Sequence, residues 1–306
     1  MSICLLILSA SGCSTHSPSL PIYVEPEVLP EASDKEAISA ETTDLKYSAS
    51  VSNEIIKPIT LDSVSTEPVL EPELTVDLWQ RMRIGFELNI TDLPSVVDDQ
   101  REWYLNNPSY LTTVFNRSRP FLYHVVEELE LANLPLELAL LPVVESTYDP
   151  LAYSSSHAAG LWQFIPSTGQ QYGLTRNRWY EGRRDVVKST SAAIIYLSYL
   201  HQRFDEDWLL ALAAYNAGEG SVSKAIQKNK KLGLPTDFRH LKLPKETRNY
   251  VPQLLALSAL IKRSEQLAIK LPNIPNETYF ETIEISNQIA LSLVLDISGT
   301  DRSLFT

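Results

Sequence analysis

The chain has 306 residues, of which 44% are hydrophobic and 21% charged, enough for one sizeable globular domain with appendages. Its formal net charge is −12, but residues 14–77 carry −10 of this, so the remainder is close to neutral. Because phosphate binding requires a basic face, we expect no nucleic-acid partner. Both cysteines lie within the first thirteen residues and the five histidines are scattered, so we expect no disulfide framework, metal site or cofactor in the body of the protein.

Residues 1–13 contain a short apolar run, Ile3–Leu8, followed by small residues and Cys13. The run is too short to span a membrane. The segment resembles the end of a bacterial lipoprotein signal, which implies lipidation of Cys13 and membrane contact through that lipid. Ser14 follows the cysteine, with no aspartate, and by the same resemblance this favours the periplasmic face of the outer membrane. The alternative is an ordinary secretory signal with an incidental cysteine.

Residues 14–77 form an acidic segment rich in proline, serine and glutamate. Residues 14–73 contain seven prolines and no glycine. Such a composition buries too little apolar area to offset the conformational entropy lost on ordering. We therefore expect a disordered linker between the N-terminal segment and the folded domain.

Helical periodicity begins at Leu78. The clearest helix is residues 185–204, whose apolar stripe repeats every three or four residues from Val186 to Phe204, with Asp185 suited to capping its start. Strand signals are nearly absent before residue 278, so we predict an all-α, multi-helix domain over residues 78–272. We expect further helices at 78–88, 94–106, 110–115, 120–132, 135–144 with a kink at Pro142, 207–215, 221–228 and 244–263.

Glu145 follows the apolar run LALLPVV and has no basic neighbour within several residues. Removal from water would raise the pKa of its carboxyl and keep it protonated near neutrality, as a general acid requires. Taken alone, the pattern favours an ordinary exposed helical glutamate.

Three further blocks carry candidate substrate-binding residues. In AAGLWQFIPSTG (158–169), Gly160 permits close backbone approach, Trp162 offers a flat apolar face and Gln163 an amide, a combination that binds sugars. In AAYNAGEG (213–220), Tyr215 and Asn216 lie at a helix end. The last block is PKETRNYVP (244–252). Individually these blocks also fit a packed turn, a helix cap and an ordinary helix start.

In this order and spacing, the four blocks resemble those of the SLT family of lytic transglycosylases, whose catalytic domain is lysozyme-like and related to goose-type lysozyme. Segments such as NRWYEGRRDVV (177–187) and FDEDWLLALAAYNAGEGSVSKAI (204–226) extend the resemblance over nearly all of residues 80–272. The resemblance implies an enzyme of cell-wall turnover that acts on peptidoglycan glycan strands, which we expect to be a monomer.

The resemblance also implies roles for individual residues. Glu145 corresponds to the catalytic acid and base, and Ser154 to the serine near the scissile bond. One departure is local: His157 stands where the family often has a small residue or asparagine, which leaves Ser155 and Ser156 as alternatives to Ser154. The substrate-binding positions implied by the four blocks are Ser146, Ser154, Gly160, Trp162, Gln163, Tyr215, Asn216 and Tyr250.

The reaction implied by the family cleaves the β-1,4 bond between N-acetylmuramic acid and N-acetylglucosamine and leaves a 1,6-anhydro end. We expect Tyr250 and Tyr215 to hold the acetamido group and orient Glu145. Neither Asp149, which fits a turn, nor Asp185, which fits a helix cap, is a convincing second carboxylate. The alternatives are a lysozyme-type muramidase that admits water and a non-catalytic peptidoglycan-binding lipoprotein.

The character of the chain changes after Pro272. We expect a strand at 279–285 and an apolar helix at 289–297 within a C-terminal extension, residues 273–306. Proteins of the family resembled here often continue into LysM modules that bind peptidoglycan. The extension contains no complete LysM repeat, which leaves a degenerate LysM-like segment and a truncated chain as alternatives.

Overall fold

The computed structural model describes residues 77–88, 94–281 and 290–299, all of which belong to one compact unit, residues 68–306. The signal-like segment with Cys13 and the linker lie outside the described residues, except for Asp77, which caps the first helix. No strand is present in the described ranges, so the prediction of an all-α fold is confirmed there. None of the described helices is long and apolar enough to cross a membrane.

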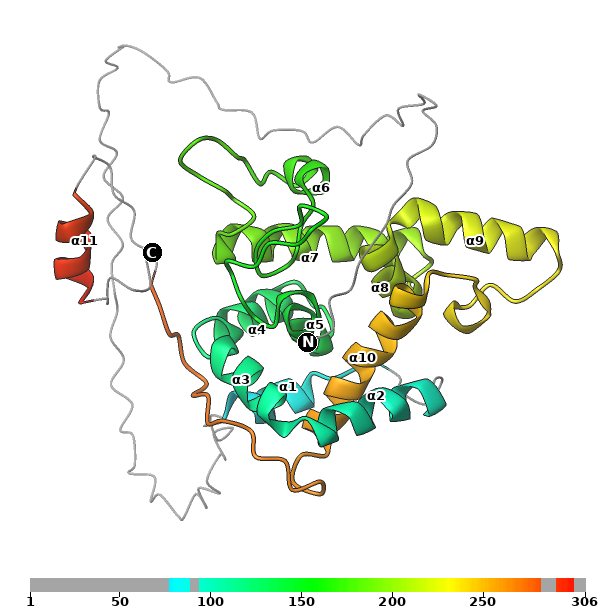
Figure 1. The fold of residues 1–306 in the computed structure, drawn as a ribbon, viewed down its shortest axis with the longest axis horizontal. Helices are drawn as coiled ribbons and strands as arrows, with labels where there is room; N and C mark the ends of the chain where they lie inside the picture. The colour runs from blue at the N-terminus through cyan, green and yellow to red at the C-terminus, as the bar shows by residue number, and fades with distance from the viewer. Residues whose placement is uncertain (1–76, 89–93, 282–289, 300–306) are drawn as a thin grey trace, which may run out of the picture. The chain divides into compact units, whose positions relative to one another are not determined.

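Most helices follow one another with short connections, but long ones join α5 to α6 (147–165) and α6 to α7 (172–185) (Figure 1). They are α1 (Leu78–Ile84), α2 (Pro94–Asn106), α3 (Pro108–Ser118), α4 (Leu122–Leu131), η1 (Leu136–Leu140), α5 (Leu141–Ser146), α6 (Pro166–Gln171), α7 (Val186–Arg203), α8 (Trp208–Ala217), α9 (Glu219–Lys231), η2 (Phe238–His240), α10 (Lys245–Lys262) and α11 (Leu291–Ser298), where η denotes a 3-10 helix.

Two predicted helices agree closely with the structure. The bounds of α2 are those predicted. The α7 helix begins one residue after Asp185, whose carboxylate accepts a hydrogen bond from the backbone N–H of Lys188, as expected of a capping residue. The stripe on α7 is buried against α4 and α8.

The segment predicted as one kinked helix at 135–144 is instead two helices. A 3-10 helix, η1, ends at Leu140, and α5 begins at Leu141. Pro142 therefore lies in the first turn of α5, where a missing N–H costs nothing, rather than in a helix interior. The consequence is that α5 is short and starts a new direction just before Glu145.

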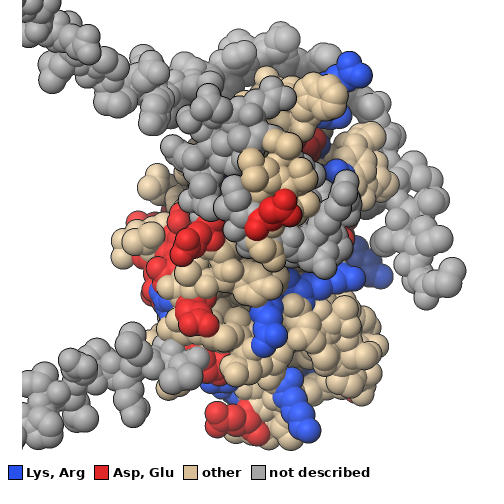
Figure 2. Space-filling model, turned by 90° about the vertical axis from the view of Figure 1, so that its left-hand side faces the viewer, with Lys and Arg blue, Asp and Glu red and all other residues tan. Residues whose placement is uncertain are grey.

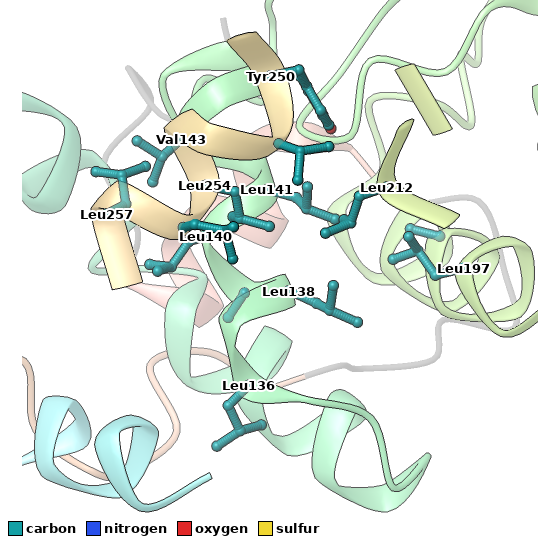
Figure 3. Close-up of a cluster of buried hydrophobic side chains, with 14 of the residues drawn as sticks. Leu136, Leu138, Leu140, Leu141, Val143, Leu197, Leu212, Tyr250, Leu254 and Leu257 are labelled. Atoms are coloured by element: carbon teal, nitrogen blue, oxygen red, sulfur yellow. The ribbon is translucent and has the colours of Figure 1, made fainter. Parts of the chain in front are cut away.

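The two short helices η1 and α5 run through the centre of the core. Leu136, Leu138, Leu140, Leu141 and Val143 are buried, and Figure 3 shows them between side chains of α7, α8 and α10. The long helix α10 packs against α2, α8, η1 and α5 at once. The core therefore fixes the position of α5 relative to the first half of α10.

The connection after α1 is tied to the core by a buried carboxylate. Glu137, on η1, accepts hydrogen bonds from the backbone N–H of Glu87 at 3.1 Å and of Leu88 at 2.9 Å. Burial raises the pKa of Glu137, while these two hydrogen bonds oppose that rise. Gly85 passes so close to Leu136 that a Cβ there would lie 2.4 Å from the leucine Cδ1.

The segment after α10 returns to α1. The Trp79 indole donates to the Pro272 carbonyl at 2.7 Å, and the backbone N–H of Leu78 to the Ile274 carbonyl at 3.1 Å. Arg81 of α1 also donates to the Asn276 side chain at 2.9 Å, so contacts with α1 extend at least four residues beyond the predicted boundary at 272. Residues 279–281 form no strand, and the rest of the predicted strand lies outside the described residues. The predicted apolar helix at 289–297 is confirmed as α11.

We predict that Glu137→Ala lowers the free energy of unfolding by about 2 kcal/mol, because it leaves two partly buried N–H groups without an acceptor. Chemical denaturation at pH 7 measures this loss. As a matched control, Glu265→Ala removes an exposed carboxylate and should change the value by less than about 0.5 kcal/mol. Equal effects of the two substitutions would contradict the assigned role of Glu137.

Candidate active site

Glu145 lies in the last turn of α5, and an unusual backbone ends this helix. Thr147 and Tyr148 have φ of 55° and 58°, the left-handed region that non-glycine residues rarely adopt. Each costs about 1 kcal/mol or more. Tyr148 is buried and its hydroxyl donates to the Ala139 carbonyl at 2.9 Å, while Arg117 donates to the Thr147 hydroxyl at 2.9 Å. These contacts hold the strained exit that stops α5 directly after Glu145.

The carboxyl of Glu145 has the electrostatics of a general acid. Burial raises its pKa to about 7 from an ordinary value of 4.5, and the like charge of Glu246 adds to the rise. The Tyr250 hydroxyl opposes it by donating a short hydrogen bond, 2.5 Å, to Glu145 Oε1. Since a pKa near the operating pH suits both proton donation and removal, Glu145 is equipped to do both.

Tyr215 lies close to Glu145 but does not bond to it. Its hydroxyl donates to the Trp162 backbone carbonyl at 2.9 Å, and the negative charge of Glu145 contributes to the raised pKa of this phenol. We expected both tyrosines to orient Glu145. Only Tyr250 does so, whereas Tyr215 fixes the loop that carries Trp162.

Asn216 links the end of α8 to the start of α10. Its Oδ1 accepts a hydrogen bond of 2.8 Å from the hydroxyl of Thr247, a buried residue on the first turn of α10. Its amide nitrogen bonds to no other described residue and the side chain is only half-buried. Asn216 can therefore donate to a ligand without losing its structural bond.

Trp162 does not offer a sugar-binding face, contrary to our expectation. Its side chain has no exposed surface, and its indole N–H donates to the Thr190 hydroxyl on α7 at 3.0 Å. Gly160 likewise serves the fold. It has φ of 83°, and a Cβ there would lie 1.7 Å from the Arg183 carbonyl, so the close approach is to the protein's own backbone.

Ser146 is also a structural residue rather than a substrate contact. It is buried, and its hydroxyl lies within hydrogen-bonding distance of the Leu161 carbonyl (2.8 Å) and the Pro142 carbonyl (3.1 Å). This bonding ties α5 to the loop of Trp162. The expected substrate-binding roles of Ser146, Trp162 and Gly160 are therefore corrected to positioning roles.

Residues 153–164 form a compact turn segment, the 153–164 loop, in which Ala159 bridges to both Tyr153 and Phe164. Ser154 is half-buried there, and its hydroxyl oxygen accepts from the Ala158 N–H at 3.0 Å. Ser155 and Ser156 are exposed. His157 has φ of 63°, which explains why asparagine, tolerant of left-handed backbone, would suit the same position.

Gln163 lies at the far end of this loop with φ of 49°. Its amide nitrogen donates to the Gly160 carbonyl at 2.9 Å, while its amide oxygen bonds to no described residue. Ser154 donates its hydroxyl proton to no described residue either. With Asn216, these two side chains supply partly exposed polar atoms that remain free for a ligand.

Sequence reasoning missed the residue that holds the loop in place. Arg183 is 2% exposed, and its guanidinium binds both Glu181 oxygens at 2.7–2.8 Å. Its remaining nitrogen, Nη1, donates to the carbonyls of His157 (2.7 Å) and Phe164 (2.9 Å). The pair Glu181 and Arg183 within two residues, just before a capped helix, was the available signal. The described residues contain no cluster of side chains suited to a metal.

Comparisons with known proteins identify a family and several relatives of this chain. The family model "Transglycosylase SLT domain" matches residues 126–236, which include Glu145, Ser154, Gln163, Tyr215 and Asn216. Membrane-bound lytic murein transglycosylase D of Escherichia coli (strain K12) is 44% identical over 227 residues, which cover 74% of this chain and 50% of that protein. The chain thus spans about half the length of this relative.

A putative tributyltin chloride resistance protein of Alteromonas sp. (strain M-1) is 40% identical over 52% of this chain and 76% of that protein. Among solved structures, the 70 kDa soluble lytic transglycosylase of Escherichia coli matches 61% of this chain and 32% of its own, with 20% identity and a TM-score of 0.38. The family model and the identity to lytic murein transglycosylase D show that this chain belongs to the SLT-domain lytic transglycosylases.

Proposed function

We propose that the chain is a peptidoglycan lytic transglycosylase that cleaves the β-1,4 bond between N-acetylmuramic acid and N-acetylglucosamine, with Glu145 as acid and then base. The observation that carries the proposal is the state of Glu145, whose burial raises its pKa to about 7 while Tyr250 holds its Oε1 at 2.5 Å. Family membership agrees with it. The helical site is proposed to be lysozyme-like in architecture.

In the proposed reaction, protonated Glu145 gives its proton to the glycosidic oxygen, and the bond from that oxygen to C1 of the muramic acid breaks. The acetamido oxygen of the same sugar shares the charge that develops at C1. The Glu145 carboxylate then removes the proton of the C6 hydroxyl, whose oxygen bonds to C1. The products are a 1,6-anhydro end and a free 4-hydroxyl, no water is consumed, and Glu145 ends protonated again.

A single carboxylate suits this route better than hydrolysis by a pair. Asp149 accepts the N–H of Leu151 in a turn, and Asp185 caps α7 while accepting the Tyr180 hydroxyl at 2.8 Å. Glu246, the other carboxylate whose charge acts on Glu145, is exposed. A lysozyme-type muramidase that admits water to the same site is the alternative, and a wall-binding lipoprotein without activity is a second one.

The free polar atoms at the site define proposed substrate contacts. Ser154 can donate its hydroxyl proton, Gln163 can accept through its amide oxygen, and Asn216 can donate through its amide nitrogen. These groups match the hydroxyls and acetamido groups of amino sugars. We assign glycan binding to these three residues, and we assign the orientation of Glu145 to Tyr250.

The proposal also covers the membrane anchor and the division of the chain into a linker, a catalytic domain and a C-terminal extension. One relative is named as membrane-bound. We propose that residues 1–13 are a lipoprotein signal and that lipidated Cys13 anchors the protein at the periplasmic face of the outer membrane. Residues 14–77 then serve as a linker, residues 78–272 as the catalytic domain and residues 273–306 as a C-terminal extension. The enzyme is proposed to act as a monomer.

Digestion of purified peptidoglycan by the full chain, followed by mass spectrometry of the released muropeptides, tests the proposal. We expect products one water lighter than hydrolytic fragments, with ends that resist borohydride reduction. Reducible muramic acid ends would instead establish the muramidase. Wall binding without any release would establish the non-catalytic alternative.

Replacing the Glu145 carboxyl by an amide should lower activity without destabilising the fold. We predict that Glu145→Gln lowers kcat by about 10²–10⁴, the usual contribution of positioned proton transfer. It should also stabilise the fold at high pH. Folded Glu145 binds its proton up to about pH 7, whereas unfolded glutamate releases it near 4.5, so the free energy of unfolding falls as pH rises through this window.

The glutamine variant cannot titrate, so its advantage over the unsubstituted chain should grow from pH 4.5 to 7, by up to about 3 kcal/mol. Denaturation curves at pH 4.5, 6 and 8 measure the difference. A variant that is inactive but shows the same pH dependence of stability as the unsubstituted chain would refute the raised pKa of Glu145.

Two substitutions should move the pH profile in opposite directions. The acid step requires protonated Glu145, so kcat/KM should fall as pH rises through about 7. Tyr250→Phe removes a hydrogen bond that stabilises the carboxylate, so this alkaline limb should move to higher pH. Glu246→Gln removes a like charge and should move it to lower pH, by less because Glu246 is exposed.

Tyr215→Phe is the matched control for Tyr250→Phe, since it also removes one phenol hydroxyl, from a half-buried side chain, but breaks the bond to the Trp162 carbonyl instead. Its alkaline limb should shift less than that of Tyr250→Phe. If the two phenylalanine variants shift the limb equally, Tyr250 has no special role in tuning Glu145.

A further inference from the structure

The connection between α6 and α7 presents an exposed aromatic side chain with no evident structural purpose. Trp179 is 87% exposed at the tip of a tight turn that runs from Arg176 to Glu181 and projects from the helices (Figure 1). Asn177 fixes this tip, because its Oδ1 accepts the N–H of Trp179 at 2.7 Å and of Tyr180 at 2.9 Å. A rigid turn with an exposed indole has the character of a binding surface.

Exposed cations lie along the segment that carries the indole. The Arg178 guanidinium lies 5.1 Å from the Trp179 ring, and the Arg184 guanidinium lies 5.9 Å from the ring of Tyr153. Lys188 lies 5.2 Å from the Tyr180 ring. All three cations are exposed, and none forms an ion pair with a described carboxylate. We call Arg178, Trp179, Arg184 and Lys188 the cationic patch.

The acidic residues of the same segment are committed elsewhere. Glu181 binds Arg183 with both oxygens and also pairs with Arg176 at 3.4 Å. Asp185 caps α7 and accepts the Tyr180 hydroxyl. The patch therefore retains its positive charge and attracts anions. Figure 2 shows the same separation of charge more widely, with most acidic side chains toward one side of that face and most basic ones toward the other.

The cationic patch is fastened to the 153–164 loop. Buried Arg183, next to Arg184 in the chain, donates to the carbonyls of His157 and Phe164. The ring under Arg184 belongs to Tyr153, whose hydroxyl hydrogen-bonds the His157 ring at 2.7 Å. Tyr153 directly precedes Ser154, so a ligand held by Ser154 has the patch as its neighbour.

We propose that the cationic patch binds the carboxylate-bearing peptide stems of peptidoglycan, an inference that rests on the proposed function. The glycan strand itself is uncharged apart from its peptides, so exposed arginines have no partner on the sugars. A peptide attached to a muramic acid carries free carboxylates, and the planar guanidinium of arginine binds a carboxylate through two parallel hydrogen bonds. Trp179 supplies the apolar surface on which the stem packs.

The test separates peptide from glycan. Binding of the full chain carrying Glu145→Gln, which should leave strands uncut, is titrated with peptide-bearing glycan strands and with strands stripped of peptides by an amidase, whose newly freed lactyl carboxylates are then converted to uncharged amides. We expect Arg178→Ala/Arg184→Ala to weaken binding of peptide-bearing strands about three- to tenfold, the range for two exposed ion pairs, and to leave stripped strands unchanged. The difference should shrink as salt rises.

Lys262→Ala/Arg263→Ala is the matched control. It removes two exposed cations at the far end of α10, about 18 Å along the helix from Tyr250, and should change neither affinity. Trp179→Ala should weaken the peptide-bearing strands alone. Equal weakening on both kinds of strand, or no effect on either, would overturn the proposal.

The proposed transglycosylase activity and the proposed peptide binding can be refuted independently. Absence of anhydro products from the unsubstituted chain would refute the proposed function, whereas the binding titration requires no turnover. In the active chain, the arginine variant should raise KM on peptide-bearing strands and leave kcat unchanged. A fall in kcat with unchanged KM would place Arg178 and Arg184 in loop positioning instead and overturn peptide binding.

Discussion

The partial burial of the Glu145 carboxyl is the constraint on which the rest of the structure depends. A carboxylate at the end of a core helix is unfavourable, and the raised pKa expresses that cost. The fold tolerates it because the short helix α5 is packed on all sides through Leu141 and Val143 and is stopped by two left-handed residues. Tyr250 supplies one donor, enough to hold the group but not enough to make it an ordinary surface acid.

The surrounding polar network mostly positions backbone rather than meeting a substrate directly. Ser146 and Tyr215 both bond to carbonyls of the 153–164 loop, at Leu161 and Trp162, and Arg183 bonds to two more. Buried hydrogen bonds of this kind are costly to break singly, so they define one loop geometry. The side chains left with free polar atoms, Ser154, Gln163 and Asn216, are thereby presented from a rigid frame.

The sequence predicts the helices well where periodicity is long, as in α7, and where proline marks a start, as in α2. It fails at 135–146, because an apolar run that is buried all round has no periodicity to separate a 3-10 helix from an α-helix. The prediction for Trp162 was wrong for a related reason. An indole in a glycine-rich turn can bind a sugar ring or pack in the core, and only its burial in the folded structure distinguishes the two. The role of Arg183 could not be predicted from the sequence, because the carbonyls that it binds are distant in sequence.

The hydroxyl groups near Glu145 are neutral, whereas the positive charge of this part of the protein is exposed. Near Glu145 the neighbours with hydroxyls are phenols whose pKa values are raised, so they stay neutral and donate hydrogen bonds without adding charge. The exposed positive charge lies instead on the α6–α7 connection and the first turn of α7. A guanidinium next to Glu145 would lower its pKa and remove the proton that the reaction needs. In the proposed reaction, cations on the α6–α7 connection rather than beside Glu145 can attract the carboxylates of peptide stems while the Glu145 carboxyl remains protonated.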